Sequence, residues 1–161
     1  MAKAKKDKGA ASDVIATNRR ARFDYEIVDT FEAGIALLGP EVKSLRAGRA
    51  NLGDAYATIR KGRLWLVNLH ISPYAQAGRA NPEPTRDRAL LMHRQEIRRL
   101  GSKLAERGFT LVPLRLYWKS GRAKIELALA RGKRRHDKRE SIRRRESDRE
   151  LARATRARGR R

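Results

Sequence analysis

The chain has 161 residues and a formal net charge of +22, which leaves room for one domain with tails and favours a polyanionic partner. It contains no cysteine, so disulfides, thiol catalysis and thiolate zinc sites are excluded. It has no apolar run of about 18 residues and no apolar stretch after the charged N-terminus, so we expect a cytoplasmic protein without a membrane partner. Nucleic acid is the expected partner, in preference to an acidic membrane surface.

Residues 1–16 are basic and contain few large apolar side chains, which predicts a flexible N-terminal segment. Period-two alternation follows, with Phe23, Tyr25 and Ile27 on one face of a predicted strand. Further strands are predicted, in chain order, at residues 34–38, 54–60, 63–69, 109–118 and 122–129.

Short turns that contain glycine join two pairs of these strands into hairpins. Lys61-Gly62 closes the first hairpin and residues 119–121 close the second, each with a glycine available for positive φ. Pro113 lies inside a predicted strand, so that strand is expected to be at a sheet edge or to be bulged.

Two helices are predicted between the strands. Pro40 is typical of a first helical position and Gly48 of the residue after a helix end, which indicates a short helix between them. Ile97, Leu100 and Leu104 recur at helical spacing, which predicts a second helix between residues 93 and 108.

Residues 72–88 contain three prolines and are expected to form a long surface loop. Six short strands with two or three flanking helices predict a mainly β fold for residues 17–130. Among small antiparallel barrels that bind nucleic acid, the OB-fold is the leading candidate.

Residues 131–161 form a basic tail with fifteen Lys/Arg and five Asp/Glu. Its only large apolar residues are Ile142 and Leu151, so we expect it to be disordered alone. Acidic residues precede arginines by three or four positions, as Glu140 precedes Arg144, and this spacing favours a helix. The tail is therefore predicted to become helical on a polyanionic surface.

No catalytic or metal-binding constellation is present in the sequence. The three histidines, His70, His93 and His136, are not at ligand spacing and have no carboxylate cluster beside them. Gly132-Lys133 lacks the earlier glycine and the following hydroxyl residue of a phosphate-binding loop. We therefore expect no enzyme activity, no metal and no cofactor.

The aromatic residues are numerous enough to stack on RNA bases where they are exposed. We expect Trp65 and Trp118 to belong to the barrel core instead. Tyr25 directly follows the basic string at residues 18–22, which could lie along a phosphate backbone while the ring stacks. Core packing and base stacking both stay open for Tyr25.

Several short strings of residues, which follow one another from about residue 16 to residue 161, are typical of one protein family. Two of them, Glu41-Val42-Lys43-Ser44-Leu45-Arg46 and His136-Asp137-Lys138-Arg139, are highly specific. The others are Asn18-Arg19-Arg20-Ala21 with Tyr25, Phe31-Glu32-Ala33-Gly34, Pro84-Thr85-Arg86, Leu90-Leu91 and Leu116-Tyr117-Trp118. Together they resemble the SsrA-binding protein family, SmpB.

The resemblance implies an OB-like barrel that binds the tRNA-like domain of transfer-messenger RNA (tmRNA) and carries it to stalled ribosomes for trans-translation. It implies elongation factor Tu as a partner through the shared tmRNA. The resemblance implies RNA contacts from Asn18, Tyr25, Glu32 and Leu91. We expect the basic residues Arg19, Arg20, Lys43, Arg46 and Arg86 to bind the RNA with them. The tail would occupy the small-subunit decoding centre and the empty mRNA channel, with ribosome contacts from Lys133, Arg134, Arg135, His136, Asp137, Lys138 and Arg139.

A structural ribosomal protein, built as a barrel with basic extensions, is the alternative function. An RNA-processing enzyme is a third hypothesis, for which the sequence offers no candidate group. Residues 74–83 match no string of the family, and no role is assigned to them.

Overall fold

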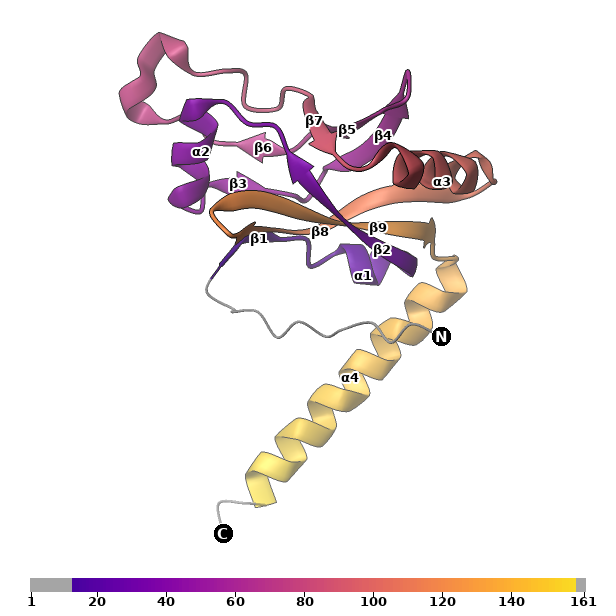
Figure 1. Cartoon of the computed structure of the whole chain (residues 1–161). Helices are drawn as coiled ribbons and strands as arrows, with labels where there is room; N and C mark the ends of the chain where they lie inside the picture. Colours follow the sequence, from indigo (N-terminus) through magenta and orange to yellow (C-terminus); the bar gives the residue numbers. More distant parts are fainter. Residues whose placement is uncertain (1–12, 159–161) are drawn as a thin grey trace.

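Six antiparallel strands close into a ring in the computed structural model, which describes residues 13–158 apart from the side chains of residues 135–137, 157 and 158. The ring runs through β8 (Phe109–Lys119), β4 (Tyr56–Arg60), β5 (Arg63–Val67), β7 (Arg88–Leu91), β2 (Tyr25–Ile35) and β9 (Arg122–Gly132). Strand β9 pairs with β8 and closes the ring. The prediction of a mainly β barrel of about six strands is confirmed (Figure 1).

Both predicted hairpin turns are present. Lys61 and Gly62 connect β4 to β5 with φ angles of 49° and 73°, and Ser120 and Gly121 connect β8 to β9 with φ angles of 51° and 73°. Positive φ at both central residues is the type I′ geometry, whose twist matches that of the strands it joins.

Strand β8 is bulged, as its internal proline predicted. The register of β8 against β9 shifts between Pro113 and Arg115. The other edge of β8 pairs with β4 at Leu111 and with the short strand β1 (Val14–Thr17) near its C-terminal end. The bulge allows β8 to pair with both β4 and β1 along this edge, because it bends the strand and increases its local twist.

Leucine and isoleucine side chains fill the barrel. Leu64 and Leu66 of β5 are fully buried, and Trp65 between them therefore lies on the outer side, where the Arg60 guanidinium is 6.0 Å from its ring. The prediction of a core position is wrong for Trp65. Trp118 is partly buried and packs against the core.

The two predicted helices are α2 (Gly39–Arg46) and α3 (Arg94–Ala105), which lie at opposite ends of the barrel in Figure 1. The backbone N–H of Leu38 donates to Oε2 of Glu41 at 2.8 Å, which caps the start of α2. Gly48 adopts a φ of 70° just after α2, a conformation that favours glycine at a helix end.

Several short elements of two to six residues were not predicted. They are β1, α1 (Ala21–Asp24), β3 (Ala50–Asn51), β6 (His70–Ile71), β7 and the 3-10 helix η1 (Ala75–Ala80). The predicted strand at 34–38 is also wrong, since Gly34 and Ile35 finish β2. Strand β1 begins inside the segment 1–16 that was expected to be flexible, and residues 1–12 of that segment lie outside the described residues.

The tail forms the helix α4 (Arg135–Arg158), which points away from the barrel (Figure 1). The expected disorder of the isolated tail stays a prediction. Between residues 13 and 158, no helix combines the length and the apolar character needed to cross a membrane.

Candidate nucleic-acid interface

Asn18 holds the basic turn at the entrance to the barrel in place. Its side chain is buried, its Nδ2 donates to the carbonyl of Pro113 at 3.2 Å, and its Oδ1 accepts from the N–H of Ala21 at 3.2 Å. Its own backbone N–H donates to the carbonyl of Leu114 at 2.7 Å. Asn18 therefore ties α1 to β8, and its amide is occupied by contacts within the chain.

The two arginines after Asn18 are exposed, and the Arg20 side chain is 83% accessible although it lies 3.8 Å from the Asp24 carboxylate. Tyr25 begins β2 and is partly buried. It lines an open pocket of about 410 Å³ together with Arg20 and Tyr56. Arg20 and two tyrosines thus line one pocket, and the stacking of Tyr25 on an RNA base stays a prediction.

Glu32 lies on the outer face of the sheet, held from β8. The hydroxyl of Tyr117 donates to Glu32 Oε2, and Lys119 Nζ lies 3.2 Å from the same carboxylate. The Tyr117 hydrogen bond, aided by Lys119, lowers the pKa of Glu32 against the opposing effect of its partial burial. Burial and the bond to Glu32 raise the pKa of Tyr117. Glu32 therefore stays ionised and fixed in position.

Arg115 extends the same row of side chains along β8. Its Nε is 2.8 Å from Oε2 of Glu126, and its guanidinium lies 5.0 Å from the Tyr117 ring. Glu126 is paired directly with Glu32 across β2 and β9. Two neighbouring carboxylates are therefore each matched by a cation from β8, which gives this face alternating charges and an aromatic ring.

The site prediction missed Arg115, Tyr117 and Lys119, although their period-two spacing on either side of the buried Leu116 is visible in the sequence. That spacing places the three side chains on one face. It does not say which residue of another strand they contact, so the partnership with Glu32 was not visible.

Leu91 is an exposed apolar residue beside this face, with a relative accessibility of 61%. It pairs with Gly34 across β7 and β2, and a Cβ atom at Gly34 would lie 3.3 Å from the Cβ of Leu91. Glycine at this position therefore lets the Leu91 side chain lie over the strand that carries Glu32. An exposed leucine next to charged groups can pack against a sugar or a base edge.

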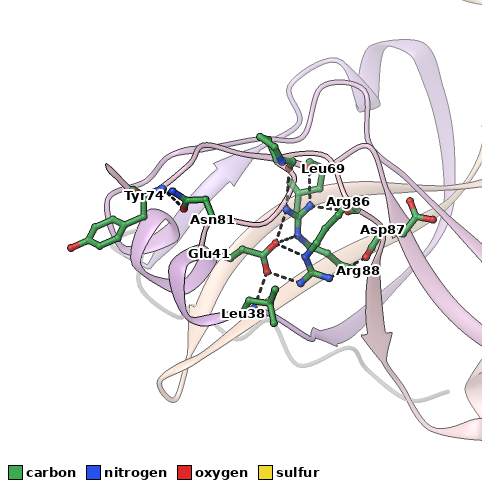
Figure 2. A network of polar contacts seen from close by, with 9 residues as sticks. Leu38, Glu41, Leu69, Tyr74, Asn81, Arg86, Asp87 and Arg88 are labelled. Atoms are coloured by element: carbon green, nitrogen blue, oxygen red, sulfur yellow. Dashed lines mark hydrogen bonds and ion pairs between the residues drawn. The ribbon is translucent and has the colours of Figure 1, made fainter. Parts of the chain in front are cut away.

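Lys43 and Arg46 are exposed on α2. The Nζ of Lys43 lies 5.3 Å from the ring of Tyr74, in the loop that precedes η1. The side-chain amide of Asn81 holds that loop closed through two hydrogen bonds to the backbone of Tyr74, at 2.9 and 2.8 Å (Figure 2). These two cations lie on the far side of the α2 helix from Glu41, which points inward.

Arg86 points at Glu41, within the buried polar network of Figure 2. Its Nε and Nη2 lie 2.8 and 2.7 Å from the two Glu41 oxygens. Arg88 is fully buried, with its Nε 2.8 Å from Glu41 and its Nη1 2.6 Å from the carbonyl of Leu69. Burial tends to raise the pKa of Glu41, but the bonds from Arg86 and the Leu38 N–H and the charge of Arg88 outweigh it and lower the pKa.

This network gives Arg86 a structural role in addition to any contact with a partner. Its side chain is 28% accessible, so one edge of the guanidinium still faces solvent. The network joins α2 to the strand β7 and to the end of the loop at 72–87. Together with the buried Leu45, it fixes α2 and its exposed cations relative to the barrel.

The base of the tail contacts α1. The N–H of Lys133 donates to the carbonyl of Asp24 at 3.0 Å, and its Nζ donates to the carbonyl of Arg22 at 3.0 Å. Lys138 Nζ lies 3.4 Å from the Asp24 carboxylate, and Arg145 lies 5.1 Å from the ring of Phe23.

Arg134 and Arg139 are exposed, and the side chains of Arg135, His136 and Asp137 lie outside the described residues. The expected tail residues therefore start next to the basic turn at 18–22. Among the side chains that the structure describes, no group of three His, Cys, Asp or Glu could hold a metal ion.

Comparison with known proteins identifies relatives of nearly full length. A family model described as "SmpB protein" matches residues 15–157. The SsrA-binding protein of Symbiobacterium thermophilum is 58% identical over 159 residues, covering 98% of each chain. That of Desulforudis audaxviator is 58% identical over 142 residues, covering 88% of this chain and 93% of the relative.

A solved structure matches the barrel as well. A chain of the structure described as "tmRNA-SmpB: a journey to the center of the bacterial ribosome" is 51% identical and has a TM-score of 0.65. The match covers 80% of this chain and 94% of that chain.

Proposed function

This chain belongs to the SmpB protein family, and from this membership we infer that it binds tmRNA and acts in the rescue of stalled ribosomes. The observation that carries the inference is the match to a chain of the tmRNA-SmpB structure at 51% identity over 80% of this chain. The role is one of binding and positioning RNA, and the excess of cations over acids supports it.

We propose that the tRNA-like domain of tmRNA binds the face formed by the basic turn, the outer side of β2 and the exposed end of β7. The exposure of Arg19, Arg20 and Leu91 and the fixed carboxylate of Glu32 support this surface. Asn18 would act by positioning the turn, since its own amide is occupied. The full proposed set is Asn18, Arg19, Arg20, Tyr25, Glu32, Lys43, Arg46, Arg86 and Leu91.

The tail has a separate proposed role at the ribosome. A basic helix that leaves the barrel next to α1 could enter the decoding centre and the empty mRNA channel while the barrel stays on tmRNA. The ribosome-contacting set proposed is Lys133, Arg134, Arg135, His136, Asp137, Lys138 and Arg139. Elongation factor Tu would join the complex through the shared tmRNA, in the cytoplasm where translation takes place.

Binding of the purified chain to the tRNA-like domain tests the proposal. At about 0.2 M salt, where non-specific phosphate contacts are strongly weakened, the tRNA-like domain should bind much more tightly than an unrelated hairpin of equal length. Equal affinities would contradict the proposed function. Stoichiometric presence on all purified ribosomes, stalled or not, would favour the structural ribosomal protein instead.

A further inference from the structure

The pocket beside the basic turn is lined by Asp54, an acid whose charge would not by itself favour the binding of RNA. It has a volume of about 410 Å³, within the range of about 300 to 1,000 Å³ typical of small-ligand pockets. Its lining residues include Tyr25, Tyr56, Arg20 and two acids, Asp24 and Asp54. Tyr56 is 43% accessible, so its ring is available to a ligand.

Asp54 stands on a rigid turn between β3 and β4. The N–H of Ala55 donates to the carbonyl of Leu52 at 3.1 Å, and the N–H of Gly53 donates to Oδ1 of Asn51 at 2.8 Å. Leu52 and Ala55 on either side are buried, which anchors the turn to the core. The backbone that carries the exposed Asp54 side chain is therefore held in place at the pocket.

Two other acids near the proposed RNA surface, Glu32 and Asp24, are already paired. Glu32 is held by Tyr117 and Lys119, and Asp24 is within ion-pair distance of Arg20 and Lys138. Among the side chains described, those at 13–134 and 138–156, Asp54 has no such cation partner. In a chain of net charge +22 that binds a polyanion, an unpaired carboxylate repels the phosphates of the partner. Hydrogen bonds that the partner donates to the carboxylate can offset this repulsion.

We propose that this pocket binds one unstacked guanine of a folded RNA, whose N1–H and N2–H donate to the Asp54 carboxylate while the ring stacks on Tyr56 or Tyr25. Guanine fits because its Watson–Crick edge carries two adjacent donors that match the two oxygens of a carboxylate. Adenine and cytosine offer only an exocyclic amine there, and a phosphate offers no donor. Arg20, which also lines the pocket and is largely exposed, would contact the neighbouring phosphate.

This inference rests on the proposed function and deepens it, since it assigns a base to a particular pocket. The guanine could belong to tmRNA or to ribosomal RNA, and both sources are tested in parallel. The full-length chain is bound to the tRNA-like domain and, separately, to small ribosomal subunits without mRNA. Each RNA is then treated with kethoxal, which modifies the N1 and N2 edge of unpaired guanine.

We expect one guanine, in one of the two RNAs, to be protected by the wild-type chain and to react again when Asp54→Asn is used. The affinity for that RNA should fall about tenfold, as for loss of a bidentate base contact. Tyr56→Ala should expose the same guanine, whereas Tyr56→Phe should keep it protected because the stacking face remains. Unchanged melting temperatures show that the variants fold.

Glu106→Gln is the control, because Glu106 is also exposed, lies at the end of α3 outside the proposed RNA surface, and its replacement removes the same charge. Either acid-to-amide change makes the chain more positive, so electrostatics alone would strengthen RNA binding. Weaker binding with Asp54→Asn alone therefore requires the loss of a contact. Normal wild-type binding with no Asp54-dependent guanine in either RNA would overturn the inference and leave the proposed function intact. Loss of wild-type binding itself would count against the proposed function.

Discussion

The hydroxyl of Tyr117 donates a hydrogen bond to the carboxylate of Glu32 although 85 positions separate them in the chain. Tyr117 is on β8 and Glu32 is on β2, with β9 between the two strands. The bond fixes an ionised carboxylate on the face proposed to bind RNA. The orientation of Glu32 as an acceptor there depends on Tyr117, which was not among the predicted site residues.

Tyr117→Phe should raise the pKa of Glu32 towards its ordinary value of 4.5, because the hydrogen bond that contributes most to lowering it is removed. Carboxyl chemical shifts followed through a pH titration would measure this change. The free energy of unfolding should fall by only about 0.5–1.5 kcal/mol, as for loss of one hydrogen bond. An unchanged Glu32 titration would contradict the geometry described here.

The same variant should weaken binding to the tRNA-like domain, and by less than Glu32→Ala does. The phenylalanine ring keeps its place near Arg115, so only the orientation of Glu32 is lost. Affinity at fixed salt measures both effects. Equal losses would indicate that Tyr117, rather than the carboxylate, makes the important contact.

Glu41→Gln should destabilise the barrel by about 3–5 kcal/mol, because Arg88 is fully buried and would keep its charge without the matching carboxylate. Urea unfolding measures the loss. The matched control is Arg60→Gln, which removes an exposed pair with Asp87 and should cost about 0–1 kcal/mol. Similar costs for the two variants would show that the buried network contributes no more than a surface pair.

The stabilising effect of Glu41 should depend on pH in a definite direction. Its pKa is lowered in the folded chain, so the stabilisation is fully present above the ordinary pKa of 4.5. It should be lost as the pH falls from 4.5 through the lowered folded-state pKa. The difference in unfolding free energy between the wild type and Glu41→Gln should therefore shrink in acid, which urea titrations at a series of pH values can follow.

Truncation after Arg134 should separate RNA binding from ribosome rescue. It keeps Gly132, which pairs with Tyr25, and Lys133, which bonds to α1, and removes the helix α4. Binding to the tRNA-like domain at about 0.2 M salt should change little, since the tail adds mainly non-specific phosphate contacts. Peptide tagging on stalled ribosomes should stop. Equal loss of both activities would show that the tail also grips tmRNA.

The sequence alone determined the main secondary structure and the basic tail. Glycine turns at Lys61-Gly62 and Ser120-Gly121, Pro40 at a helix start and the spacing of Ile97, Leu100 and Leu104 are local signals, which need no knowledge of the rest of the chain. The strings that resemble the SmpB family also lie in the sequence, and the family is confirmed by the match over residues 15–157.

Only the tertiary structure decided which of these residues meet. Strands as short as β1 and β7 owe their existence to pairing with distant partners, since four residues carry too little periodicity to specify a strand. Glu41 contacts Arg88 across 47 positions, and Glu32 contacts Tyr117 across 85. These contacts follow from the register and closure of the barrel, which depend on all six ring strands together, and the same fold brings Asp54, Tyr25 and Tyr56 to the lining of one pocket.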